Sequence, residues 1–300
     1  MRVGVDIGGT KTEAVVIDPD GGIVAQLRHP TGFGPESVVE SAVRAITDAV
    51  DAAGLTLAHL QSIGVGIPGA VDALEGRVSH ALNLGVERLD LGAQLSSRLD
   101  TTVRVENDVN AAALGAFHAL DLDRASSMGY LNLGTGLAAG LVLGGQLWRG
   151  SRGAAGEIGH ILVDPAGPLD LDGQPGGLEV MASGSGIARQ WGTGEDNSVT
   201  AVLDAADSGD ARAIEIRRRL FDGVATSVRI LVPTVDVDVV VIGGGISRLG
   251  DRLLGGVEQI FDSWGQQSPF IHSLELGSRL RLIPDGAPVA ALGAAWLGGN

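Results

Sequence analysis

The chain has no cysteine among its 300 residues. Disulfide bonds, thiolate metal ligands and a cysteine nucleophile are therefore excluded. Long hydrophobic runs are also missing, so no stretch of the sequence reaches the length of a transmembrane helix. Residues 1–6 lack the apolar stretch of a signal peptide. These absences predict a cytoplasmic protein that has no membrane partner.

Basic residues are few, because 21 lysines and arginines stand against 36 acidic residues and the net charge is −15. An acidic chain binds nucleic-acid phosphates poorly unless it carries a local basic patch. The densest basic run, residues 217–219, lies in a helical pattern and is interpreted as a solvated helix face. We therefore expect no nucleic-acid partner.

Glycine, by contrast, is abundant at 47 residues, and the glycines cluster between short apolar runs. Such clusters are typical of tight turns and of backbone that approaches a ligand closely. Two series of strand-like runs, within residues 2–27 and 128–148, each have a glycine turn after their first strand. Helical patterns are mixed with strands elsewhere, so the sequence predicts an α/β protein with an internal duplication at the scale of a domain.

Three of the glycine turns follow predicted strands and are candidates for phosphate binding, because glycine lets backbone N–H groups approach phosphate oxygens. Asp6, at the end of the first strand, supplies the oxygen ligand that Mg²⁺ prefers. A single turn of this kind also fits an ordinary β-hairpin, and the pattern is neither a P-loop nor a dinucleotide fingerprint. The candidate residues are Gly8, Gly9, Thr10, Lys11, Gly134, Thr135, Gly136, Gly243 and Gly244.

The segment Glu106-Asn107-Asp108 lies where a predicted strand ends and a predicted helix begins. Asp108 has the chemistry of a general base that accepts a hydroxyl proton during phosphoryl transfer. The alternative is that Asn107 or Asp108 caps the helix. The motif alone leaves both roles open.

Acceptor side chains suited to sugar hydroxyls lie in a glycine-rich, loop-rich stretch of the sequence. They are Glu157, His160 and, further along, Glu179. A lone histidine beside apolar residues is more often structural, and a lone glutamate is more often a surface residue. Long loops are commonly functional, so the setting favours a binding site.

Together these motifs resemble those of the ROK family (repressor, open reading frame, kinase). The resemblance runs from residue 2 to about residue 298. Its most specific stretches are residues 106–112, 133–136 and 149–160, supported by residues 6–11, 67–72, 83–85 and 243–247.

The resemblance implies an actin-like, ribonuclease H-like ATPase fold of two α/β domains with a cleft between them. The N-terminal small domain is expected at residues 1–108 plus 288–300, and the C-terminal large domain at residues 109–287. The family also implies ATP and Mg²⁺ as cofactors, a small-molecule sugar as partner, and a homodimer or homotetramer.

Roles for individual residues follow from the same resemblance. Asp108 is expected to be the catalytic base, and Asp6 to contact Mg²⁺ through ATP. The three glycine turns with Lys11 are expected to bind the nucleotide. The residues expected to bind the sugar are Asn83, Asn107, Glu157, His160 and Glu179.

One departure from the family pattern concerns zinc. Family members usually carry Cys-x-Cys-Gly-x-x-Gly-Cys before the sugar-binding glutamate, whereas residues 170–177 of this chain contain no thiol. The remaining donors are His160, Asp170 and Asp172, which make a poor zinc site, so no structural zinc is expected. Pro168, Pro175 and the two aspartates are expected to hold this loop instead.

The sequence therefore predicts an ATP-dependent kinase of the hexokinase or glucokinase type, which phosphorylates an exocyclic hydroxyl of a hexose, with glucose as the leading candidate. One alternative is a kinase for N-acetylglucosamine or N-acetylmannosamine. Another is a non-catalytic sugar-sensing protein of the same family. A DNA-binding regulator is disfavoured, because such members carry an additional N-terminal winged-helix domain.

Overall fold

The computed structural model describes residues 1–170, 173–192 and 198–298. The chain forms two compact units. The first contains Met1–Arg124, Gly140–Ala155 and Ala287–Asn300, and the second contains Ala125–Ala139 and Gly156–Gly286. Within the described residues, no helix is both long enough and apolar enough to span a bilayer.

The first unit is built on a mixed five-stranded sheet with the order β3-β2-β1-β4-β8. In this sheet β1 pairs antiparallel with β2 and parallel with β4. A small antiparallel sheet, absent from the sequence-based prediction, joins β5, β6 and β7. The strands are β1 (Arg2–Ile7), β2 (Lys11–Ile17), β3 (Ile23–Pro30), β4 (Ser62–Ile67), β5 (Ala70–Asp72), β6 (Arg77–Ala81), β7 (Val86–Leu89) and β8 (Val103–Asn107).

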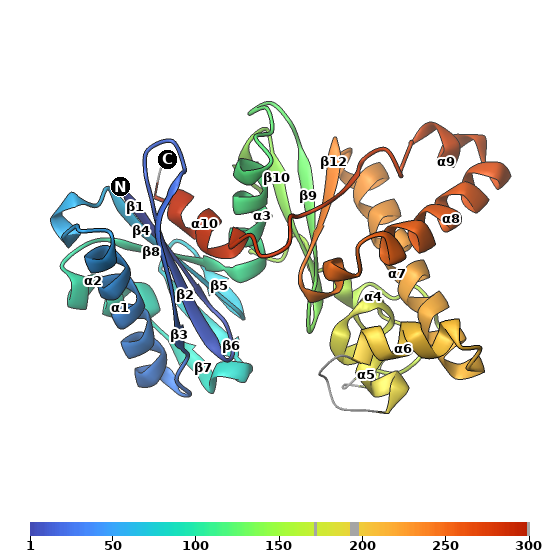
Figure 1. The fold of residues 1–300 in the computed structure, drawn as a ribbon, viewed down its shortest axis with the longest axis horizontal. Coiled ribbons are helices and arrows are strands. Elements are labelled where there is room, and N and C mark those ends of the chain that lie inside the picture. The colour runs from blue at the N-terminus through green and yellow to red at the C-terminus, as the bar shows by residue number, and fades with distance from the viewer. Residues whose placement is uncertain (171–172, 193–197, 299–300) are drawn as a thin grey trace. The chain divides into compact units, whose positions relative to one another are not determined.

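Helices cover both faces of this sheet, with α1 and α2 on one side and α3 and α10 on the other (Figure 1). Successive side chains of a strand point to opposite faces. Val3, Val5 and Ile7 of β1 therefore pack into the core under α1, whereas Gly4 faces α10. The helices are α1 (Pro35–Ala52), η1 (Leu57–His59), η2 (Leu82–Leu84), α2 (Leu91–Leu99), α3 (Asp108–Ala119) and α10 (Val289–Trp296).

Glycines let the C-terminal helix α10 lie directly on its neighbours. A Cβ added to Gly4 would lie 1.9 Å from the Ala291 carbonyl oxygen, and one added to Gly293 would lie 1.7 Å from the Ala111 carbonyl oxygen. Residue 293 is in α10 and residue 111 in α3, so the two helix backbones are in contact. This packing holds β1 and α3, which carry the candidate residues Asp6 and Asp108.

The second five-stranded sheet has the order β11-β10-β9-β12-β13, which repeats the order of the first. The agreement supports the predicted internal duplication. β9 and β13 run parallel to β12 on its two sides, and β10 runs from the second unit into the first. The strands are β9 (Met128–Leu133), β10 (Leu137–Leu143), β11 (Gln146–Leu147), β12 (Val239–Gly243) and β13 (Leu280–Leu282).

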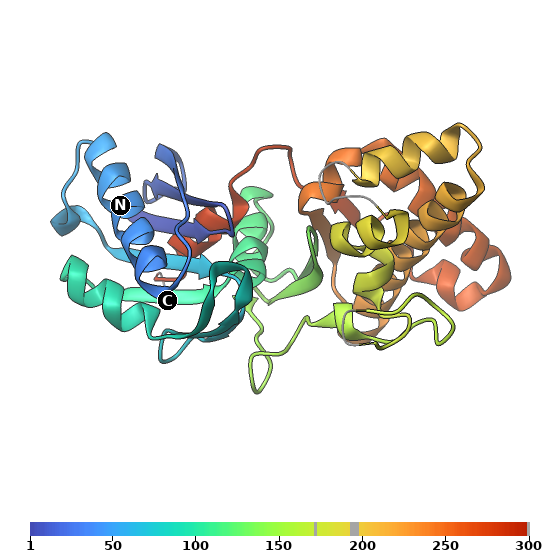
Figure 2. The same ribbon diagram turned by 90° about the horizontal axis from the view of Figure 1, so that it is seen from below.

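A cluster of helices packs together in the second unit, seen in yellow to red in Figure 2. Residues 178–191 form two helices, because the chain breaks at Ser183. Its hydroxyl accepts a hydrogen bond of 3.0 Å from the Gly186 N–H and caps a new helix. The helices are η3 (Ile158–His160), α4 (Leu178–Ala182), α5 (Gly184–Trp191), α6 (Ser198–Asp207), α7 (Ala211–Val235), η4 (Gly245–Leu249), α8 (Asp251–Gln267) and α9 (Pro269–Ser273).

The compact units differ from the expected domains in one respect. The sequence-based division begins the second domain at residue 109, whereas the structure groups α3 and residues 140–155 with the first unit. The physical reason is the close contact of α3 with α10, which returns to the first sheet.

Candidate active site

The turn between β1 and β2 contains three of the predicted nucleotide residues, and the fourth, Lys11, is the first residue of β2. Its closure is a hydrogen bond of 2.9 Å from the Gly8 N–H to the Lys11 carbonyl oxygen. A Cβ on Gly9 would lie 3.4 Å from Asn83 Nδ2, so the predicted sugar residue Asn83 lies against this turn. Thr10 and Lys11 are exposed. The first unit therefore brings nucleotide-side and sugar-side candidates together.

The Asp6 carboxyl group, at the end of β1, is buried and lies near two other carboxylates. Burial, the Asp108 carboxylate and the Glu13 carboxylate together raise the pKa of Asp6 from 3.8 to about 7, and nearby Lys11 lowers it only in part. A bound divalent cation would relieve this repulsion, because it becomes the largest local charge. The carboxylate of Asp6 therefore fits the predicted magnesium role.

Asn107 and Asp108 occupy different positions at the start of α3. Asn107 is the N-cap, and its Oδ1 accepts from the N–H groups of Val109 at 2.9 Å and Asn110 at 3.2 Å. Its Nδ2 donates to the Gly69 carbonyl oxygen at 3.2 Å. Asp108 is the first residue of the helix and is half-buried. The capping role that the sequence left open belongs to Asn107.

Glu106 and Arg149 form an ion pair that sequence reasoning missed. The Glu106 side chain is only 3 % exposed. Arg149 Nε donates to its Oε2 at 2.6 Å. The sequence carried no signal for its burial, because strand alternation places Glu106 on the same face as the exposed Arg104.

In the second unit, the turn Gly134–Gly136 is held by the start of α5. The Gly184 N–H donates to the Gly134 carbonyl oxygen at 2.9 Å, and the Ser185 N–H donates to the Thr135 carbonyl oxygen at 3.0 Å. The sequence analysis did not identify this segment as a contact of the turn. Its Ser-Gly-Ser-Gly run at residues 183–186, at a helix start, could have indicated it.

The third glycine turn lies beside the second. Gly244 has a φ of 81°, and a Cβ there would lie 2.5 Å from the Leu133 carbonyl carbon. A Cβ on Gly243 would lie 2.0 Å from the Tyr130 hydroxyl oxygen. Both positions therefore require glycine, and two backbone turns meet at the ends of β9 and β12. Backbone turns of this kind can present N–H groups to phosphate oxygens.

Glu179 lies against the Gly134–Gly136 turn. Its Oε2 accepts a hydrogen bond of 2.9 Å from the Leu137 N–H. A Cβ on Gly159 would lie 2.2 Å from the Leu137 carbonyl oxygen and 3.3 Å from the Glu179 Cβ. The segment that contains Gly159 therefore packs beside Glu179, and Glu157 and His160 of the same segment are exposed.

The loop at residues 161–177 is held by backbone hydrogen bonds. The Asp170 carboxylate accepts from the Gln174 N–H at 2.7 Å, and the Pro168 carbonyl accepts from the Gly176 N–H at 2.8 Å. The Val163 N–H in turn donates to the Gly176 carbonyl at 2.9 Å. These contacts include Pro168 and Asp170, two residues expected to hold the loop, while Asp172 lies outside the described residues.

The donors present do not fit the zinc site that the family pattern implies. The chain has no thiol, and the described residues contain no group of three or more His, Cys, Asp or Glu side chains that could hold a metal ion.

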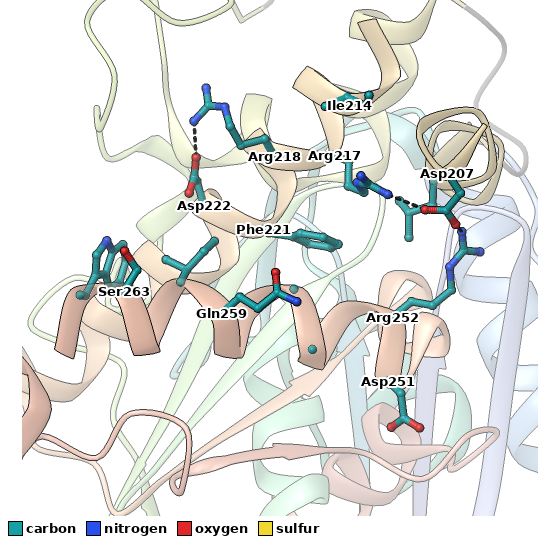
Figure 3. Close-up of a pocket in the computed structure, with 15 residues that line it drawn as sticks. Asp207, Ile214, Arg217, Arg218, Phe221, Asp222, Asp251, Arg252, Gln259 and Ser263 are labelled. Atoms are coloured by element: carbon teal, nitrogen blue, oxygen red, sulfur yellow. Dashed lines mark hydrogen bonds and ion pairs between the residues drawn. The ribbon is translucent and has the colours of Figure 1, made fainter. Parts of the chain in front are cut away.

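A pocket of about 710 Å³ lies among α6, α7 and α8 (Figure 3). Its charged rim is paired internally, because Arg217 and Arg252 both contact Asp207, and Arg218 contacts Asp222. The basic run 217–219 is thus neutralised by neighbouring acids, as expected of a solvated helix face. In the part of the chain that the structure describes, the pocket lining contains none of the predicted site residues.

The predicted site residues fall into two groups. The first unit holds Asp6, Gly8, Gly9, Thr10, Lys11, Asn83, Asn107 and Asp108, and the second holds Gly134, Thr135, Gly136, Glu157, His160, Glu179, Gly243 and Gly244.

Known proteins are similar to this chain in sequence and fold over most of its length. A glucokinase from Halalkalibacterium halodurans is 31 % identical, over 98 % of this chain and 94 % of the relative. An N-acetyl-D-glucosamine kinase from Shigella flexneri is 32 % identical, over 84 % and 89 %. The crystal structure of a ROK family glucokinase from Streptomyces griseus, in complex with glucose and AMPPNP, is 29 % identical and superimposes with a TM-score of 0.76, over 99 % and 98 %.

The fold is accordingly that of the ROK kinases, a mixed α/β, actin-like ATPase fold with two five-stranded sheets. The model of the ROK family matches residues 2–298. The chain therefore belongs to the ROK family.

Proposed function

We propose that this protein is an ATP-dependent sugar kinase that transfers a phosphoryl group to an exocyclic hydroxyl of a hexose, with glucose as the leading substrate. Asp108 is the general base in this proposal. The glucokinase relative and the neighbour in complex with glucose and AMPPNP support the substrate and the donor.

The observation that carries the proposal is the arrangement of Asn107 and Asp108 at the start of α3. Asn107 is the N-cap of the helix, and Asp108 follows it directly and accepts a hydrogen bond of 3.0 Å from the Val109 N–H at Oδ1. Asp108 lies in the first turn of α3, at the positive end of the helix dipole. A strand end followed by a helix is also a rigid mount, and positioning is the main contribution of a kinase to phosphoryl transfer.

Several side chains have hydrogen-bonding capacity for a sugar. An amide nitrogen carries two N–H groups. Asn107 Nδ2 uses one of them for Gly69, so the other is available for a hydroxyl. Glu179 accepts at Oε2, and a carboxylate can accept further hydrogen bonds. Together with Asn83, Glu157 and His160 they orient the hydroxyl toward Asp108 in this proposal.

The nucleotide site is proposed from the glycine cradles. The proposed ligands of Mg²⁺ and ATP are Asp6, Thr10, Lys11 and the turns at 134–136 and 243–245. The bound magnesium–nucleotide complex supplies the phosphoryl group and neutralises its charge. The chain's own part is to present backbone N–H groups and the Lys11 ammonium to the phosphate oxygens.

An N-acetylhexosamine is the second candidate substrate, and one observation favours it. Phe33 is 75 % exposed and Leu82 is 73 % exposed, although both are large and apolar. Leu82 precedes Asn83, and a Cβ on Gly85 would lie 2.5 Å from the Phe33 ring. Each of these exposed apolar side chains thus lies near the sugar candidate Asn83, and an apolar side chain there suits the methyl group of an acetamide.

The test is a coupled assay of ADP release with MgATP and a panel of hexoses and N-acetylhexosamines. We expect turnover on one of them, and Asp108→Asn is expected to reduce kcat by a factor of about 10² or more while sugar binding persists. Asp20→Asn, in an exposed turn, is the matched control. Binding of a sugar without turnover by the wild-type protein would contradict the proposal and favour the sugar-sensing alternative.

A further inference from the structure

The Glu106 side chain is a charged group placed almost fully out of water. Such a carboxylate is costly unless its oxygens are hydrogen-bonded and its charge is paired. Oε1 accepts from the Asn107 N–H at 3.0 Å and from Asn110 Nδ2 at 3.0 Å. Oε2 accepts from Arg149 Nε at 2.6 Å. Both oxygens are therefore occupied by named donors.

The two groups that donate to Glu106 Oε1 belong to residues at the start of α3, on either side of Asp108. Asn107 caps α3, and Asn110 lies in the first turn of the same helix. Glu106 thus fixes the residue before Asp108 and the residue two positions after it. A shift of the Glu106 carboxylate would move the helix start that aims the proposed base.

The partner on Oε2 belongs to the segment that leads to Glu157. The Arg149 carbonyl oxygen accepts from the Ala155 N–H at 3.2 Å, which closes a loop with positive φ at Gly150 and Gly153. Glu157, a proposed sugar ligand, follows two residues after Ala155. Arg149 therefore anchors the base of this loop to the strand end that carries Asn107 and Asp108.

We propose that Arg149 is a positioning residue, which through Glu106 holds the Asp108 helix start and the loop at residues 149–155 in one arrangement. The inference rests on the proposed kinase function and extends it to a residue that touches neither substrate. The competing explanation is a purely structural ion pair, whose loss destabilises the fold because a buried carboxylate is left without its cation.

Two variants separate positioning from stability. Arg149→Met removes the guanidinium and is expected to lower both the Tm and kcat. The double variant Glu106→Gln with Arg149→Met removes the buried charge as well, while the glutamine oxygen still accepts from Asn107 and Asn110. We expect the double variant to regain much of the Tm but to keep a kcat lowered about ten- to hundredfold, as misplaced reacting groups predict.

The matched control is Arg104→Met, an exposed arginine on the same strand as Glu106. Its kcat is expected to stay within about twofold of the wild type. A double variant that regains kcat together with the Tm would overturn the proposal, because the effect of Arg149 would then be stability alone. A kcat for Arg149→Met equal to that of Arg104→Met would overturn it as well.

Limited trypsin digestion measures how firmly the loop is held, and it does not depend on kinase activity. Arg152 is exposed within the loop and is a cleavage site. Cleavage after Arg152 is expected to be faster in both Arg149 variants than in the wild type and in Arg104→Met, and unchanged cleavage would overturn the proposal. If the wild-type protein turned over no sugar but the Arg149 variants were cleaved faster, the kinase function would fail while the anchoring of the loop would stand.

Discussion

Asn107 and Asp108 are neighbours with nearly the same side-chain shape, and only the geometry distinguishes their roles. Asparagine and aspartate are about equally good N-caps, so the sequence predicted a cap and a candidate base without assigning them. The structure assigns the cap through two N–H groups that point at Asn107 Oδ1. For Glu106 the sequence predicted no role. Its burial and its arginine partner, 43 positions away in sequence, follow only from the fold.

Asp6 gives a prediction for pH dependence in the protein without nucleotide or divalent cations. Its pKa is raised from 3.8 to about 7 by burial and by Asp108 and Glu13. The folded state therefore binds this proton more tightly than the unfolded state between these two values. The contribution to the free energy of unfolding is fully present below about pH 4 and is lost as the pH rises through about 7.

The measurement is urea unfolding of the wild type and Asp6→Asn at several pH values from 4 to 8. We expect the stability of the wild type, relative to the variant, to fall as the pH rises across this range. Addition of Mg²⁺ and ATP should then shift the wild-type curve and leave the variant curve much less changed. Parallel curves for the two proteins would show that Asp6 titrates normally.

At the scale of elements, the C-terminal helix shows what a pattern of small residues can and cannot predict. Small residues dominate residues 288–297, and the family resemblance assigned residues 288–300 to the first domain. The backbone contacts of Gly4, Gly64, Gly115 and Gly293 were not predictable, because an abundance of glycine does not say which neighbour lies within 2 Å of a missing Cβ. The short strands β5–β7 were missed for a related reason, since three to five residues give too little periodicity.

Substitution of Gly293 tests this packing. Gly293→Ala would place a methyl group 1.7 Å from the Ala111 carbonyl oxygen, so α10 must move away from α3. We expect a loss of about 2–4 kcal/mol in the free energy of unfolding, measured by urea denaturation. Gly255→Ala is the matched control, because Gly255 lies in helix α8 and, within the described structure, a Cβ there would meet nothing within 4 Å.

The control is expected to gain about 0.5–1 kcal/mol, since alanine has a higher helix propensity than glycine. Equal effects of the two substitutions would mean that the close contact of α10 does not contribute to stability. Because α3 carries Asp108, Gly293→Ala should also lower kcat, and Gly255→Ala should not.

At the scale of the whole molecule, the repeated strand order was predictable because both halves carry the same strand–glycine turn–strand pattern. The boundaries of the two halves along the chain were less predictable, because α3 and residues 140–155 pack with the first unit. The two groups of site residues follow the same division, with the proposed base in one unit and most sugar ligands in the other. The expected homodimer or homotetramer stays a prediction, which sedimentation velocity would test.

The absence of cysteine makes the response of the whole protein to chelators a sharp test. In the family pattern that this chain resembles, thiolates and a histidine hold zinc at the loop before the sugar-binding glutamate. Here the corresponding loop is closed by Asp170 and by the backbone of Pro168, Val163 and Gly176. Gly176 has a φ of 58°, and a Cβ there would lie 1.7 Å from the Asp164 carbonyl oxygen, so the loop depends on tight backbone packing.

We therefore expect the Tm of the purified protein to be unchanged by EDTA or 1,10-phenanthroline, and kcat to return fully once Mg²⁺ is restored. Elemental analysis should find less than one zinc per chain. Gly176→Ala, in contrast, should lower the Tm in the presence and absence of chelator alike, because it breaks backbone contacts and no metal is involved. A Tm that falls with chelator and is rescued by zinc but not by magnesium would show that His160 and the carboxylates of this loop bind metal after all, and that carboxylate ligands have replaced the thiolates.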